Sequence, residues 1–128
     1  MTVHVINLFS HWLFSAPTAP RSFKLVVNSS TEITASWLEP LKLNGLFRRY
    51  VVMYGKVRGK LDERFDTTET TYTLNSLEEF TEYFVQVHAE TSVSGAASNI
   101  EQAKTLQDGK LLPFRFLDFE RYRVRDQT

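Results

Sequence analysis

The chain has 128 residues, of which 42% are hydrophobic, and this length suits one compact domain. Its 15 basic and 15 acidic residues give zero net charge, which argues against non-specific nucleic-acid binding because no excess of cations is available to neutralise phosphates. Cysteine is absent, so disulfides, thiolate catalysis and cysteine-based metal sites are excluded.

Residues 1–16 form an apolar leader, and no Asp, Glu, Lys or Arg occurs before Pro20. The apolar run is too short and too often interrupted to span a bilayer, so we expect no transmembrane span. A secretory signal cleaved after Ala16 or Ala19 is one interpretation. No basic residue precedes the apolar stretch and a proline follows each alanine, which argues against it. We favour a non-native or splice-derived start to a domain that begins near Pro17.

The middle of the chain, residues 17–107, consists of short runs in which apolar and polar residues alternate. Alternation with a period of two predicts strands, and the polar clusters between the runs predict turns. The expected strands are residues 22–27, 32–37, 48–54, 60–65, 72–74, 83–90 and 98–105. Residues 92–97 are expected to form a loop of small side chains. This pattern predicts an all-β, seven-stranded, immunoglobulin-like antiparallel sandwich.

An ordered set of residues in this segment matches a known pattern. The set consists of Pro20, Trp37, Glu39-Pro40, Asn44-Gly45, the run 50–54, Leu77, Thr81, Tyr83, Gly95 and Thr105. At these spacings the segment from about residue 17 to residue 105 resembles a fibronectin type III domain. The resemblance implies a non-enzymatic interaction or spacer module of a cell-adhesion or receptor-type protein, set among similar modules.

The alternating residues predict the interior of the sandwich. Trp37 is the largest apolar side chain available between the sheets. Tyr83 is placed to form a tyrosine corner, in which its hydroxyl binds the backbone a few residues upstream, and Leu77 closes the same end of the core. The full predicted interior is Leu25, Ile33, Ala35, Trp37, Tyr50, Val52, Tyr72, Leu74, Leu77, Tyr83, Val85, Val87 and Ala89.

Catalytic and metal-binding patterns are not found in the sequence. The three histidines, His4, His11 and His88, lack metal-ligand spacing, and no Gly-x-Ser-x-Gly motif or glycine-rich phosphate loop occurs. We therefore expect no enzyme activity, no cofactor and no metal. Asn28-Ser29-Ser30 is an N-glycosylation acceptor in a predicted turn, usable only if the chain enters the secretory route.

Two surfaces are candidates for contact with a protein partner. If alternate residues of the third and sixth strands face inward, Val51, Met53 and Phe84 lie together on the outer face of one sheet. A contiguous apolar patch there favours a contact with a partner domain or with one of the chain's own ends, whereas scattered exposure is ordinary. In the family resembled, the loops 41–47 and 91–97 lie at one end of the sandwich, which makes Asn44, Gly45, Ser94 and Gly95 candidates as well.

Residues 108–128 form an aromatic-basic tail that fits neither the helical nor the strand period, and we expect it to be poorly ordered. The partner is expected to be a protein of unknown identity, including neighbouring modules of a longer chain, and not nucleic acid. An extracellular or cell-surface location is favoured over a cytoplasmic one. The alternative is an intracellular structural module of a cytoskeletal or muscle-type protein, and glycosylation of Asn28 would decide against it.

Overall fold

A computed structural model describes residues 15–107; the predicted tail and nearly all of the predicted leader lie outside the described residues. The described part of the chain contains strands and no helix. The strands are β1 (Arg21–Val27), β2 (Ile33–Leu38), β3 (Arg49–Gly55), β4 (Glu63–Thr67), β5 (Thr71–Leu74), β6 (Glu82–Glu90), β7 (Ser94–Ala97) and β8 (Glu101–Lys104).

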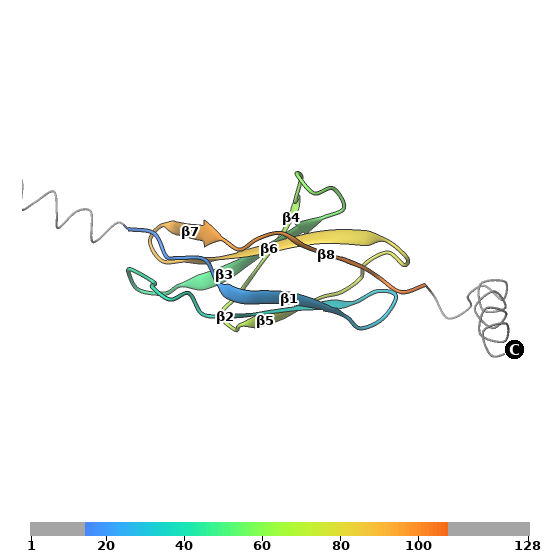
Figure 1. Cartoon of the computed structure of the whole chain (residues 1–128), viewed down its shortest axis with the longest axis horizontal. Coiled ribbons are helices and arrows are strands. Elements are labelled where there is room, and N and C mark those ends of the chain that lie inside the picture. Colours follow the sequence, from blue (N-terminus) through green and yellow to red (C-terminus); the bar gives the residue numbers. More distant parts are fainter. Residues whose placement is uncertain (1–14, 108–128) are drawn as a thin grey trace, which may run out of the picture.

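The strands form two antiparallel sheets that pack face to face (Figure 1). One sheet has the order β1-β2-β5, and the other has the order β4-β3-β6-β7, with β8 also paired to β6. The described chain starts at one end of the long axis and finishes at the other (Figure 1). The predicted antiparallel sandwich is therefore confirmed.

The structure has eight strands where seven were predicted, because a short strand, β7 (Ser94–Ala97), lies in the segment expected to be a loop, ahead of β8, which lies in the last expected strand. β7 and β8 are separate pieces along the same neighbouring strand. Both pieces pair with β6, and the register shifts between His88 and Glu90. Between the pieces, the Ser98 hydroxyl accepts the Val87 N–H at 3.1 Å and the Ser98 N–H donates to the Val87 carbonyl at 2.8 Å. At this break between β7 and β8, the Ser98 hydroxyl takes the place of a backbone carbonyl as the acceptor for the Val87 N–H. The loop predicted over residues 92–97 is wrong for its last four residues, Ser94–Ala97, which form β7.

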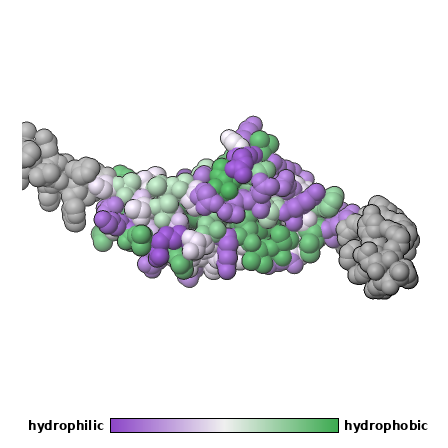
Figure 2. Space-filling view, in the orientation of Figure 1, coloured by the Kyte–Doolittle hydropathy of each residue, from purple (hydrophilic) through white to green (hydrophobic). Residues whose placement is uncertain are grey.

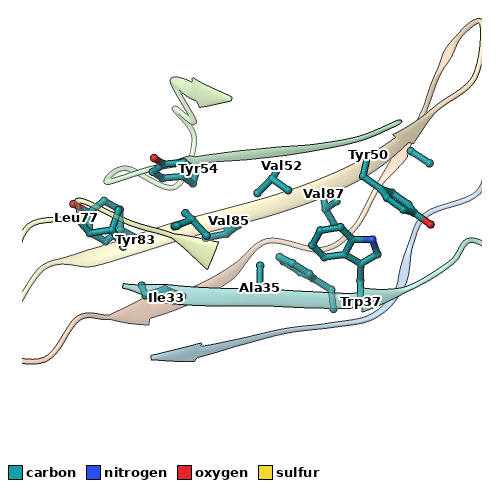
Figure 3. Packing of buried hydrophobic residues seen from close by; sticks show 13 residues of the cluster. Ile33, Ala35, Trp37, Tyr50, Val52, Tyr54, Leu77, Tyr83, Val85 and Val87 are labelled. Atoms are coloured by element: carbon teal, nitrogen blue, oxygen red, sulfur yellow. The ribbon is translucent and has the colours of Figure 1, made fainter. Parts of the chain in front are cut away.

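The inward positions of β2, β3 and β6 meet between the sheets and form the core (Figure 3). Trp37 is 3% exposed, and its ring meets that of Tyr50 edge-on, with centroids 5.3 Å apart. The buried core consists of Phe23, Ile33, Ala35, Trp37, Tyr50, Val52, Tyr54, Leu74, Leu77, Tyr83, Val85, Val87 and Ala89. Burial of these side chains is the main term that stabilises the fold.

Two residues of the predicted interior, Leu25 and Tyr72, are only half-buried and pack against the edge of the core. Phe23, which was not predicted, is buried beside Trp37. Tyr72 lies on the edge strand β5, where its ring stacks on that of Phe65 at 5.5 Å across the open side of the sandwich. Position at a sheet edge, which alternation does not reveal, accounts for its partial exposure.

The tyrosine corner predicted at Tyr83 is present. The Tyr83 hydroxyl accepts a hydrogen bond from the Glu78 backbone N–H at 2.9 Å. The Leu77 N–H, next to it in the chain, donates to the Thr31 carbonyl at 3.1 Å, which joins this segment to the turn between β1 and β2. Tyr83 and Leu77 are 4% and 6% exposed and close this end of the core.

Candidate protein-binding surface

The loop between β2 and β3 meets the loop between β6 and β7 at the end of the sandwich where the described chain starts. A Cβ added to Gly45 would lie 3.2 Å from the Cβ of Thr91, so the two loops are in contact. The Arg48 N–H also donates to the Glu90 carbonyl at 2.8 Å. Segments more than forty residues apart in the sequence therefore form one surface.

The residues that lead into β1 fix the first of these loops in place. The Thr18 N–H donates to the Lys42 carbonyl at 2.8 Å, and the Lys42 N–H donates to the Thr18 hydroxyl at 3.0 Å. The Asn44 side-chain amide donates to the Ala16 carbonyl at 2.8 Å, with Asn44 in the left-handed region at φ 56°. These bonds tie the loop between β2 and β3 to the residues that precede β1.

Apolar and cationic side chains share the tip of this loop. Leu41 is 76% exposed and Leu46 is 88% exposed, although a leucine is usually buried. The shallow groove between the loops is lined by Lys42, Leu43, Asn44, Gly45, Leu46, Arg48 and Ser92, a set without a carboxylate. We call Leu41, Lys42, Leu46 and Arg48 the loop-end surface. Within residues 15–107, neither Lys42 nor Arg48 forms an ion pair.

The four predicted loop contacts differ in accessibility. Gly45 and Ser94 are exposed, whereas Asn44 and Gly95 are half-buried. Asn44 uses its amide on Ala16, as described above. A Cβ on Gly95 would lie 2.8 Å from the Ala89 carbonyl oxygen and 2.8 Å from the Pro17 Cβ, so this position needs glycine for close packing. Of the four, Gly45 and Ser94 remain open to a partner.

The residues of the loop-end surface were not predicted individually. Their signal in the sequence is a pair of leucines with adjacent cations inside a loop that has no strand period to bury them. Alternation selects inward positions of strands, so it gives no weight to apolar residues in a loop.

The expectation that Val51 faces solvent is wrong. Val51 lies on the outer face of β3 but is 0% exposed. Its neighbours across the sheet are Asp66 on β4 and His88 on β6. Longer charged side chains on β3, β4 and β6 surround it on this face and pair with one another. The predicted patch of Val51, Met53 and Phe84 is therefore not a continuous exposed apolar surface.

The cover over Val51 is a network of ion pairs. Arg49 Nη1 lies 2.6 Å from Glu90 Oε1, and Arg49 Nε lies 3.8 Å from Asp66 Oδ2. Arg64 Nε lies 3.3 Å from Asp66 Oδ1, and its Nη2 lies 3.8 Å from Glu90 Oε2. His88 Nε2 adds a contact of 3.3 Å to the same Glu90 oxygen. The charges balance one another, so this face offers a partner little uncompensated charge.

Glu90 is the centre of the network, with a side chain only 13% exposed. Burial raises the pKa of its carboxyl group, but hydrogen bonds from Arg49, His88 and Ser94 outweigh this and leave the pKa below its ordinary value. The carboxylate is therefore stabilised in its charged form, and it orders the side chains around it.

Met53 and Phe84 are half-buried on the same outer face. The guanidinium carbon of Arg58 lies 5.6 Å from the centroid of the Phe84 ring, within the range of a cation–π contact. Part of the Phe84 ring is thus covered by the chain itself. A contact role for these two residues stays a prediction.

Within residues 15–107, no group of three or more His, Cys, Asp or Glu residues is arranged to hold a metal ion. The same part of the chain contains no helix of the length and hydrophobicity that a membrane crossing requires. Asn28 is exposed in the turn between β1 and β2.

The fibronectin type III domain model matches residues 18–104. The chain is 36% identical over 115 residues to receptor-type tyrosine-protein phosphatase F of Danio rerio and 29% identical over 101 residues to neuronal cell adhesion molecule of Rattus norvegicus. These matches cover 83% and 73% of this chain but only 6% and 8% of the relatives. The crystal structure of chicken CNTN1 FN1-FN3 domains matches with a TM-score of 0.65 and 26% identity, over 72% of this chain and 33% of that one. The chain belongs to the fibronectin type III family.

Proposed function

We propose that this domain is a non-enzymatic protein-binding module of a cell-surface adhesion or receptor-type protein, and that it binds through its loop-end surface. The relatives are by name a receptor-type phosphatase and a cell adhesion molecule, and this domain matches only a small part of each. We infer that the module works beside others in a longer protein. The start and finish of the described chain at opposite ends of the long axis suit an end-to-end arrangement (Figure 1).

The observation that carries the proposal is the exposure of Leu41 and Leu46 beside two cations that have no ion-pair partner in the described chain. Exposed leucines lose contact with water when a partner covers them, which is favourable by about 25 cal/mol per Å² of apolar area. Lys42 and Arg48 would speed association with a negatively charged surface and select against a positively charged one. The partner is thus expected to present apolar side chains flanked by carboxylates.

Binding of the fluorescent full-length chain to a panel of purified cell-surface ectodomains tests the proposal. Leu46→Ser should weaken binding at least tenfold. Lys42→Glu, made as a separate variant, should weaken binding more than Leu46→Ser does and should make the affinity less dependent on salt. The matched controls are Val57→Ser and Lys24→Glu, which alter an exposed apolar residue and an exposed cation outside the loop-end surface. Equal losses in the controls, or binding that survives the loop variants, would contradict the proposed surface.

The alternative, an intracellular structural module, keeps the same fold and predicts no ligand specific to the loop end. The names of the relatives favour the cell surface. Localisation of the tagged chain expressed with its own first residues separates the two, because the proposal requires the domain outside the cell or in the secretory route.

A further inference from the structure

The turn between β1 and β2 contains the only Asn-x-Ser/Thr triplet in the sequence, Asn28-Ser29-Ser30. Hydrogen bonds within the turn fix its backbone. The Asn28 N–H donates to the Glu32 carbonyl at 2.9 Å, and the Thr31 N–H donates to the Ser29 hydroxyl at 3.1 Å. Asn28 itself is exposed, so the triplet is accessible on the folded domain.

The side chain of Asn28 is held over the outer face of the β1-β2-β5 sheet. Its Nδ2 donates to the Thr34 hydroxyl at 2.6 Å, and the Thr34 hydroxyl lies 3.0 Å from that of Thr73 on β5. Val26 lies two residues before Asn28 and opposite Thr34, which places it on the same face. The amide nitrogen is thus directed over Val26 and the threonines.

Two exposed apolar side chains lie in this neighbourhood, and its charged residues are Glu32, which faces Asn28 across the turn, and Lys24, one outward position before Val26 on β1. Val26 is 51% exposed, and Leu106, whose N–H donates to the Ser29 carbonyl at 3.2 Å, is 53% exposed. Figure 2 shows hydrophobic residues gathered near the end of β1. The corresponding face of the other sheet carries the ion pairs around Glu90 instead. The two outer faces of the sandwich therefore differ in chemistry.

We propose that Asn28 carries an N-linked glycan whose first sugar packs on Val26 and covers this face of the β1-β2-β5 sheet. N-linkage leaves one N–H on Nδ2, and in the proposed arrangement this N–H keeps the hydrogen bond to Thr34 and orients the sugar. The C–H surface of the sugar removes the exposed Val26 methyl groups from water. The glycan then blocks protein contacts on this face and leaves the loop-end surface open. The modification needs the secretory route, and in the natural protein it rests on the proposed cell-surface location.

Production of the full chain behind a heterologous secretion signal in mammalian cells tests the site independently of the natural location. Intact mass should show one N-glycan that peptide N-glycosidase F removes. Asn28→Gln and Ser30→Ala should abolish it, and Ser29→Ala should keep it because the middle position of the triplet is free. Unmodified secreted protein would overturn the proposal, whereas loss of loop-end binding would leave it intact.

Chemical unfolding tests the packing of the sugar. The chain trimmed to its first sugar should unfold at a higher urea concentration than the chain made in bacteria. Val26→Thr keeps the branched shape and should remove most of this gain, with little effect on the bacterial chain. Lys24→Thr, on the same face but farther from Asn28, is the matched control and should keep the gain. A gain that is the same with Val26→Thr would overturn the packing.

Discussion

The hydrogen bond of the tyrosine corner can be removed with little change in shape. Tyr83→Phe deletes the hydroxyl that accepts the Glu78 N–H at 2.9 Å and keeps the ring, which is 4% exposed, in the core. The core volume is therefore preserved, and the change in stability reports the hydrogen bond and the backbone group left without its partner.

The expected size of the effect follows from the surroundings of the bond. A hydrogen bond contributes about 1 kcal/mol net, and a buried group that loses its partner costs about 1–3 kcal/mol. Glu78 is exposed, so water can reach part of the freed N–H and the lower half of this range applies. We expect the free energy of unfolding to fall by about 1–2 kcal/mol. With an m-value of about 1 kcal/mol/M, the urea midpoint falls by about 1–2 M.

Equilibrium urea unfolding of the full chain, followed by tryptophan fluorescence, measures this change. Tyr72→Phe is the matched control, because the Tyr72 hydroxyl makes no hydrogen bond to the described residues. It should change stability by less than about 0.5 kcal/mol. Equal shifts in Tyr83→Phe and Tyr72→Phe, or no shift in either, would refute the reasoning that this hydrogen bond stabilises the domain.

Two further predictions concern the network over β3. Val51→Ala should lower the free energy of unfolding by about 2 kcal/mol, because a fully buried side chain loses two carbons. Urea titration measures this change. A variant as stable as the wild type would show that the ion pairs do not keep Val51 away from water. The pKa of Glu90 is lowered in the folded state, so its charge stabilises the protein above the unfolded-state pKa of about 4.3, and this stabilisation is lost as the pH falls through the folded-state pKa. Glu90→Gln should therefore flatten the acid limb of stability against pH, and parallel curves for wild type and variant would contradict this role.

The core was predictable because the alternation of apolar and polar residues within a strand indicates which of its faces is buried. Trp37 and Val87 occupy alternate positions of runs whose intervening residues are mostly polar, so only one face of each strand can pack against the opposite sheet. Tyr83 was predictable for a second reason, the fixed distance along the chain between a tyrosine corner and its backbone donor.

The exposure of outward residues was not predictable in this way. Val51 and Met53 occupy equivalent positions on the outer face of β3, yet the first is fully buried and the second is half-buried. The difference arises from Arg64 and Glu90, which lie on different strands and meet over Val51 only after the sheet forms. Local alternation contains no information about such a contact.

By itself, the sequence determined the class of fold, the inward face of the strands that carry the core, the tyrosine corner and the glycosylation triplet, since all of these depend on residues close together in the chain. The tertiary structure decided which outward side chains stay accessible and which loops share a surface. Gly45 meets Thr91, and Arg49 meets Glu90, across more than forty residues of chain. Those meetings follow from how the two sheets pair and pack. For this reason, the outer face of β3 carries a network of ion pairs where an exposed apolar patch was predicted, and exposed leucines lie at the loop end instead.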